Sequence, residues 1–89
     1  MARLTITLQG RVQGVFFRHS ARMRAFSLGI QGEAENRPDN SLVIVLEGER
    51  KKLEEFLAWA RKGPPLARVD EIAITWEQPR GSFKGFKIL

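Results

Sequence analysis

The chain has 89 residues, a net charge of +5 and no cysteine. The lack of cysteine excludes disulfides, thiolate catalysis and a cysteine-based zinc site, and a single histidine argues against a multi-histidine metal centre. This length fits one domain, which we expect to span residues 1–89.

The first third of the chain reads as strand, turn and helix. Alternation of apolar and polar residues predicts a half-buried strand over residues 3–9. Residues 10–18 then form a turn, and apolar residues at helical spacing predict a helix over residues 17–28. Gly29 stands where a left-handed residue would end this helix. The residues expected on its buried face are Phe17, Ala21, Ala25 and Leu28.

The remaining sequence predicts four strands and one more helix. The turn Pro38-Asp39-Asn40-Ser41 joins two strands into a hairpin, since Pro fixes φ and Asp and Asn tolerate turn geometry. Gly63-Pro64-Pro65 ends the second helix. The predicted elements are strands over residues 30–37, 42–47, 69–77 and 83–89, and a helix over residues 49–62 that buries Leu53, Phe56, Leu57 and Ala60.

The resulting order is β-α-β-β-α-β with an additional terminal strand. This order is that of the split β-α-β, or ferredoxin-like, arrangement. We therefore predict an α+β fold with an antiparallel sheet and both helices on one face.

The turn over residues 10–18 is a candidate anion site. A strand-to-helix turn presents free backbone N–H groups at the positive end of a helix dipole. Gly14 permits a positive φ in its middle. Arg18 adds a forked cation that suits phosphate, although it opposes the dipole unless an anion neutralises both. The plain alternatives are an ordinary tight turn and a solvated arginine.

The anion that this turn would bind is smaller than a nucleotide. The turn has neither the G-x-x-x-x-G-K-[ST] pattern nor the G-x-G-x-x-G pattern of nucleotide-binding loops. The sequence therefore favours a small phosphorylated molecule.

Asn36 and His19 are two further polar candidates. Asn36 ends the second predicted strand, and an asparagine entering a turn is its plain interpretation. If that strand is an antiparallel neighbour of the first, their carboxyl ends lie at opposite edges, so strand direction does not bring Asn36 to Arg18. His19 follows Arg18 and is expected to point about 100° away around the helix, without a direct role.

One long motif resembles that of a known family. The residues Gly10-Arg11-Val12-Gln13-Gly14-Val15-Phe16-Phe17-Arg18 resemble the acylphosphatase signature G-x-V-Q-G-V-x-F-R. Because the similarity covers nearly the whole chain, we identify the chain as similar to acylphosphatases. It continues at Leu28-Gly29, Gly32, Asn36, Pro38-Asp39, Glu47-Gly48, Gly63-Pro64-Pro65 and Gly85-Phe86-Lys87-Ile88.

This resemblance implies a ferredoxin-like fold with an antiparallel five-stranded sheet and hydrolysis of the carboxyl–phosphate bond of acyl phosphates. It implies that Arg18 and the loop N–H groups hold the phosphate and that Asn36 orients the attacking water, which places these two residues close together. No metal or cofactor is implied. The loop residues so assigned are Gln13, Gly14, Val15, Phe16, Phe17 and Arg18.

Two positions depart from the family pattern. Glu33 stands where the family often has an uncharged residue, and strand alternation puts it on the opposite face from Asn36. Asn40 replaces the glycine of the usual Asp-Gly turn, and asparagine is the next-best residue for a left-handed position. Neither departure removes a residue to which the resemblance assigns chemistry.

Two other functions remain open from the sequence. The basic charge and strand order also fit a nucleic-acid-binding domain, but such domains carry aromatic residues on central strands. Phe83-Lys84-Gly85-Phe86 mimics such a motif only on the last strand, and residues 42–46 contain no aromatic residue. The second alternative is a non-catalytic module that binds carbamoyl phosphate or another phosphorylated metabolite within a larger system.

The expected partners are an acyl phosphate and inorganic phosphate, with no nucleic acid. Residues 1–9 contain no apolar run typical of a signal peptide. No window approaches the roughly 18 apolar residues that span a bilayer. We therefore expect a soluble, cytoplasmic monomer without a membrane partner.

Overall fold

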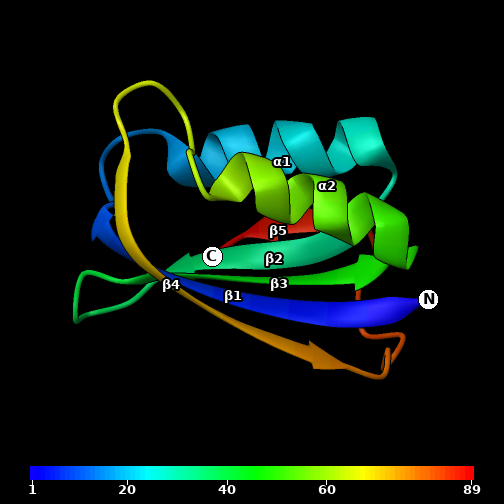
Figure 1. Cartoon of the computed structure of the whole chain (residues 1–89). Coiled ribbons are helices and arrows are strands. Elements are labelled where there is room, and N and C mark those ends of the chain that lie inside the picture. Colours follow the sequence, from blue (N-terminus) through cyan, green and yellow to red (C-terminus); the bar gives the residue numbers. More distant parts are fainter.

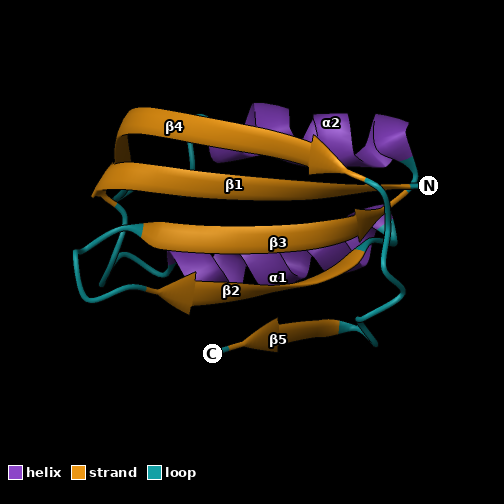
Figure 2. Cartoon of the chain, turned by 90° about the horizontal axis from the view of Figure 1, so that it is seen from below, coloured by secondary structure: helices purple, strands orange, loops and turns teal.

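A computed structural model describes all 89 residues. Two helices cover one face of a five-stranded sheet (Figure 1), and neither is long and apolar enough to cross a membrane. Figure 2 views the sheet from its uncovered face, with strand order β4-β1-β3-β2-β5. The elements are β1 (Ala2–Arg11), α1 (Phe17–Leu28), β2 (Gln31–Asn36), β3 (Leu42–Gly48), α2 (Arg50–Ala60), β4 (Arg68–Glu77) and β5 (Phe86–Ile88).

The ferredoxin-like prediction is confirmed, but the prediction of a wholly antiparallel sheet is wrong for the last strand. β1 pairs antiparallel with β3 and β4, and β2 pairs antiparallel with β3. β5 pairs parallel with β2, with Gly32 opposite Phe86 and Ala34 opposite Ile88. The sheet is therefore mixed.

Topology explains both the direction and the shortness of β5. β4 lies at one edge of the sheet and β5 at the other. A chain that leaves β4, crosses the end of the sheet and turns back must run antiparallel to β4, and hence parallel to β2. The crossing uses residues 78–85, so the predicted strand over residues 83–89 begins only at Phe86.

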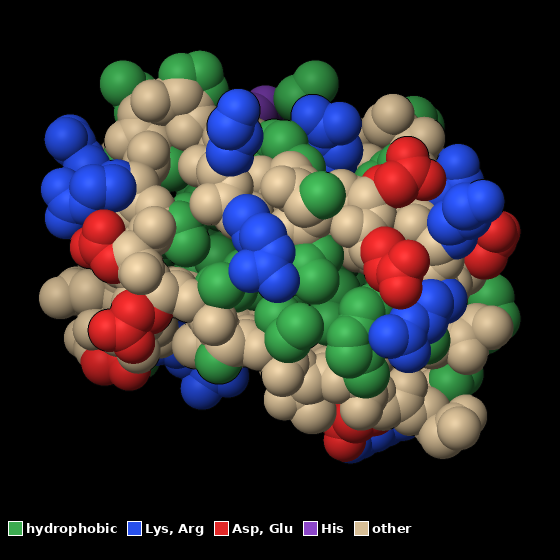
Figure 3. All heavy atoms as spheres, in the orientation of Figure 1, with side chains coloured by type: hydrophobic (Ala, Val, Ile, Leu, Met, Phe, Trp, Pro, Cys, Tyr) green, Lys and Arg blue, Asp and Glu red, His purple; other side chains and the backbone are tan.

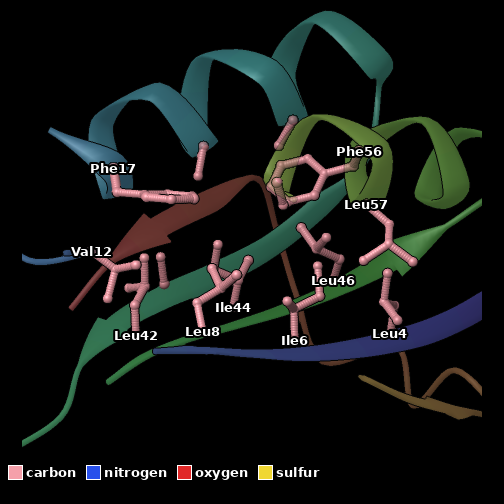
Figure 4. Close-up of a cluster of buried hydrophobic side chains, with 14 of the residues drawn as sticks. Leu4, Ile6, Leu8, Val12, Phe17, Leu42, Ile44, Leu46, Phe56 and Leu57 are labelled. Atoms are coloured by element: carbon pink, nitrogen blue, oxygen red, sulfur yellow. The ribbon is translucent and has the colours of Figure 1, made fainter. Parts of the chain in front are cut away.

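The core lies between the sheet and the two helices (Figure 4). The predicted buried faces of both helices are confirmed, except that Leu28 is only partly buried. Burying these side chains is the main stabilising contribution to the fold. The fully buried inward side chains of the two central strands are Leu4, Ile6 and Leu8 of β1 and Leu42, Ile44 and Leu46 of β3.

An aromatic stack fixes the beginning of α1. The rings of Phe17 and Trp59 meet edge to face at 5.5 Å between centroids, and those of Trp59 and Phe56 do so at 5.3 Å. Phe17 is 1% exposed. The first residue of α1 is therefore anchored against α2, which gives the preceding loop a rigid base.

The loop between β4 and β5 is held by a carboxylate from β3. Glu47 accepts hydrogen bonds from the backbone N–H groups of Arg80 at 2.7 Å and Gly81 at 3.0 Å. Arg3 donates a third through Nη1 at 2.7 Å. Burial raises the pKa of Glu47, but these hydrogen bonds outweigh burial and hold the pKa below its ordinary value.

The two departures from the family pattern leave the hairpin intact. Asn40 adopts the left-handed conformation with φ of 72°, as expected. Gly32 and Ala34 are buried on the helix-covered face, so Glu33 lies on the other face of β2. Glu33 therefore does not point toward the face that carries Asn36.

Candidate active site

The loop between β1 and α1 is shorter than the predicted turn. β1 continues through Gly10 and Arg11, beyond an irregularity in its pairing with β4. Within the loop, Gly14 has φ of 71° and Phe16 has φ of 64°. Left-handed residues among right-handed ones turn successive N–H groups toward one side, which is how backbone anion sites form.

The backbone N–H groups of this loop have no acceptor within the protein. The amides of residues 13–19 donate no hydrogen bond, and the first of the helix runs from Ser20 to the Phe16 carbonyl at 3.0 Å. The first turn of α1 contains no acidic side chain. The loop and the helix terminus therefore concentrate unpaired donors and positive potential at one place.

The side chain of Gln13 ties this loop to the β2–β3 turn. Its Nε2 donates to the carbonyl oxygens of Arg37 at 2.9 Å and Ser41 at 3.0 Å. The resemblance assigns Gln13 through its backbone N–H alone. The structure adds a positioning role for its side chain, since these contacts fix the loop relative to the end of β2.

Strand direction does bring Asn36 to the loop, contrary to the sequence-based expectation. That expectation treats β2 as an antiparallel neighbour of β1, whereas β3 lies between them. Since both pair antiparallel with β3, β1 and β2 run parallel and end at the same edge. Leu42 of β3 is opposite Leu8 of β1 and also opposite Asn36 of β2.

Asn36 and Arg18 line one cavity of about 280 Å³. The Oδ1 atom of Asn36 is buried and has no hydrogen-bond partner. Burying a carbonyl oxygen without a partner typically costs about 1–3 kcal/mol, so this atom is suited to accept a hydrogen bond from a bound molecule. The cavity lining is Val12, Gly14, Phe16, Phe17, Arg18, His19, Asn36 and Ile88.

The predicted loop residues divide into two groups. Gly14, Phe16, Phe17 and Arg18 line the cavity, whereas Gln13 and Val15 do not. Val15 is 3% exposed, so its side chain anchors the loop in the core.

His19 has a place in the cavity that the sequence does not predict. It is an exposed residue of the cavity wall, although it was expected to point away from Arg18.

The guanidinium group of Arg18 is fixed by the other end of the chain. Its Nη1 donates to the main-chain oxygen of Leu89 at 2.6 Å. Sequence reasoning misses this contact because nothing in the sequence links two residues so far apart. One nitrogen is engaged in this way, and the remaining N–H groups of the fork can bind an anion.

This arrangement suits a phosphoryl group and a water molecule. A guanidinium group and unpaired backbone N–H groups stabilise negative charge on non-bridging oxygens. The amide of Asn36 can accept one hydrogen bond through Oδ1 and donate through Nδ2. No Asp or Glu side chain lines the cavity.

Comparisons with known proteins agree with this geometry. The family model described as acylphosphatase matches residues 4–88. An acylphosphatase of Pyrobaculum aerophilum is 49% identical over 90 residues, covering 100% of this chain and 95% of that protein. The crystal structure of acylphosphatase from Bacillus subtilis superposes with a TM-score of 0.95 at 31% identity, covering 100% of this chain and 99% of that one.

The same fold also occurs as a part of a larger protein. Full-length HypF, in a phosphate- and nucleotide-bound crystal structure, matches with a TM-score of 0.88 at 32% identity. That match covers 99% of this chain but only 12% of HypF. In contrast, the Pyrobaculum and Bacillus proteins match over nearly their whole length. The protein therefore belongs to the acylphosphatase family and is an enzyme of that kind.

Proposed function

We propose that the protein hydrolyses acyl phosphates to a carboxylate and inorganic phosphate in the cavity shared by Arg18 and Asn36. The observation that carries the proposal is that Asn36, whose buried Oδ1 has no hydrogen-bond partner, lines the same cavity as Arg18. The family assignment supports the same reaction.

In the proposed complex, the phosphoryl group lies between Arg18 and the loop. The N–H groups of residues 13–18 and the guanidinium group bind its non-bridging oxygens. Phosphoryl transfer passes through a loose transition state with charge spread over these oxygens, so positioning and charge stabilisation supply most of the catalysis. The carboxylate is a good leaving group that needs little protonation.

Asn36 holds the attacking water through its amide. The water oxygen forms a bond to phosphorus while the bond from phosphorus to the acyl oxygen breaks, and the bonding electrons leave with the carboxylate. An amide accepts a hydrogen bond but cannot remove a proton. The proton of the water therefore passes to a phosphate oxygen, which yields protonated inorganic phosphate.

The proposed partners are small molecules only, acting without a metal or cofactor. No group of three or more His, Cys, Asp or Glu side chains is arranged to hold a metal ion. Lys and Arg side chains on the face shown in Figure 3 are dispersed among Asp and Glu side chains rather than gathered into a stripe. No observation favours the nucleic-acid alternative, and the cytoplasmic, monomeric state stays a prediction.

The test is hydrolysis of benzoyl phosphate in EDTA and in water enriched in heavy oxygen. We expect release of phosphate that carries the heavy oxygen, because water attacks phosphorus. Arg18→Ala should abolish most of this activity, and the matched control Arg61→Ala, an exposed arginine that caps the C-terminus of α2 and lies outside the cavity, should not. Heavy oxygen in benzoate would contradict attack at phosphorus. Phosphate binding without any hydrolysis would favour the non-catalytic module.

A further inference from the structure

A second cavity lies beside the candidate active site. It has a volume of about 310 Å³. Most of its lining is apolar, and the residues come from α1, from β5 and from the segments next to them: Arg22, Met23, Phe26, Ile30, Gly85 and Phe86. The mechanism above uses none of these residues.

The two cavities follow one another along the seam between α1 and β5. Figures 1 and 2 place β5 at the sheet edge beside α1, and these two elements pack together. Arg18 in the first cavity and Arg22 in the second are one helical turn apart. Ile88 and Phe86 are successive residues on one face of β5. The two cavities therefore lie in line along one seam, which we call the α1–β5 groove and which begins at the candidate phosphate site.

Apolar side chains beside this groove are exposed without a packing reason. Met23 is 63% exposed and Phe26 is 87% exposed. Phe16, at the mouth of the first cavity, is 72% exposed. The motif G-x-V-Q-G-V-x-F-R leaves position 16 open, so the phosphate loop does not require an aromatic residue there. Gathered apolar groups around a concave surface are typical of a binding site for an apolar ligand.

We infer that this α1–β5 groove binds the acyl chain of the substrate, so that the protein favours acyl phosphates with a linear, apolar chain. This inference rests on the proposed function, since the groove opens from the cavity that would hold the phosphate. The buried Ile30 and the half-buried Phe86 form its floor, and Met23 and Phe26 form its outer wall.

The length of the groove sets the length of the chain. Arg18 and Phe26 are eight residues apart on α1, which corresponds to about 12 Å along the helix axis. An extended alkyl chain advances about 1.25 Å per carbon, given C–C bonds of about 1.5 Å at angles near 111°. The groove therefore accommodates about eight to ten carbons.

Arg22 explains why the chain should be uncharged rather than cationic. Its guanidinium group forms no ion pair, and no acidic side chain lines either cavity. The methylene stem of an arginine covers apolar surface while its charged end stays in water. An acyl chain that ends in a carboxylate would instead pair with Arg22. Comparing such a substrate with an apolar one of equal length distinguishes the two cases.

The test compares kcat/KM for acetyl, butyryl, hexanoyl and octanoyl phosphates below their micelle concentrations. Each fully buried methylene should raise kcat/KM about fourfold. Because an open groove covers roughly half of the chain, we expect kcat/KM to rise about twofold for each added carbon. Octanoyl phosphate should exceed acetyl phosphate by roughly 60-fold. The double variant Met23→Ser, Phe26→Ser should reduce this ratio by about tenfold.

Leu66→Ser is the matched control, because Leu66 is 62% exposed and lies outside both cavities. It should leave the ratio unchanged. If kcat/KM does not change with chain length while acetyl phosphate is hydrolysed, the inference about the groove is overturned and the proposed function stays intact. A chain ending in carboxylate that outperforms octanoyl phosphate would show that Arg22 selects charge instead.

Binding of alkylphosphonates tests the groove independently of turnover. Calorimetry should show tighter binding of octylphosphonate than of methylphosphonate, and the double variant should remove this difference. Equal binding of the two phosphonates would overturn the inference even if every acyl phosphate is hydrolysed. Self-association that the double variant abolishes would also overturn it, since the apolar wall would then be an interface between copies.

Discussion

The β1–α1 loop and the β4–β5 loop both contain left-handed residues, and both present backbone N–H groups suited to an anion. In the β4–β5 loop, the carboxylate of Glu47 accepts the N–H groups of Arg80 and Gly81. In the β1–α1 loop and the first turn of α1, the N–H groups of residues 13–19 have no acceptor in the protein. The chain therefore supplies the anion for one loop and not for the other.

The two loops also differ in backbone strain. Gly81 has φ of 67°, which glycine adopts without steric cost. Phe16 has nearly the same φ, 64°, and for a bulky residue this costs about 1–2 kcal/mol. Strain and unpaired donors are tolerated where they serve binding, whereas a loop that only closes the sheet is relaxed and internally paired. Four predictions test this difference between the two loops.

The largest effect is expected for Arg18→Ala, which removes the cation that the β1–α1 loop brings to the phosphate. We expect kcat/KM for benzoyl phosphate to fall by roughly 10³-fold. Arg18→Lys should recover only part of the activity, because a point charge cannot replace two donors of a planar fork. Inhibition by inorganic phosphate should weaken in both variants. An Arg18→Ala enzyme that binds phosphate normally would place the anion elsewhere.

The next effect is expected for Asn36→Ala, which removes the group proposed to hold water. We expect kcat to fall by about 10²-fold, while the inhibition constant of inorganic phosphate changes by less than about twofold. The variant should be at least as stable as the wild type in urea, because it removes a buried oxygen without a partner. Weak phosphate binding with normal turnover would contradict the role assigned to Asn36.

Periodicity predicts most of this fold because each element carries its own apolar pattern. Leu4, Ile6 and Leu8 alternate as a strand must, and Phe17, Ala21 and Ala25 follow the helical repeat. The direction and extent of β5 are not encoded locally. They follow from the crossing of residues 78–85 over the sheet end, which depends on contacts of Glu47 that lie 33 and 34 positions away in sequence.

The candidate site, like the fold, is predictable from the sequence where its residues are close together in the chain and not where they are far apart. A motif within nine consecutive residues identifies the loop and Arg18. The place of Asn36 depends on strand order, and treating β2 as the neighbour of β1 leads to the wrong edge. The contact of Arg18 with Leu89 has no local signal at all, because it joins residues separated by 71 positions.

The third effect concerns Glu47, the internal anion of the β4–β5 loop. At about pH 7, Glu47→Gln should lower the free energy of unfolding by about 2 kcal/mol, because hydrogen bonds to a charged group are lost. The pKa of Glu47 is lowered in the folded state from an ordinary value of 4.5. The stabilisation is therefore present above about pH 4.5 and is lost as the pH falls through the lower, folded-state pKa.

Urea denaturation at several pH values measures this effect. The difference in free energy of unfolding between wild type and Glu47→Gln should become smaller as the pH falls below about 4.5. Glu54→Gln is the matched control, since its ion pair with Arg50 is more than half exposed. This control should change stability by no more than about 0.5 kcal/mol. If the difference in free energy of unfolding between wild type and Glu47→Gln did not depend on pH, the charge of Glu47 would not be what holds the loop.

The smallest effects are expected when the two left-handed residues are changed in opposite directions. Phe16→Gly should raise the free energy of unfolding by about 1 kcal/mol, because it removes strain from a side chain that is mostly exposed. Gly81→Ala should lower it by about 1 kcal/mol, since the added Cβ meets no neighbour and only the positive φ is unfavourable. Urea denaturation of both variants checks the signs. If Phe16→Gly were instead destabilising, the aromatic ring would contribute packing that outweighs its strain, and the contrast between a strained functional loop and a relaxed structural one would fail.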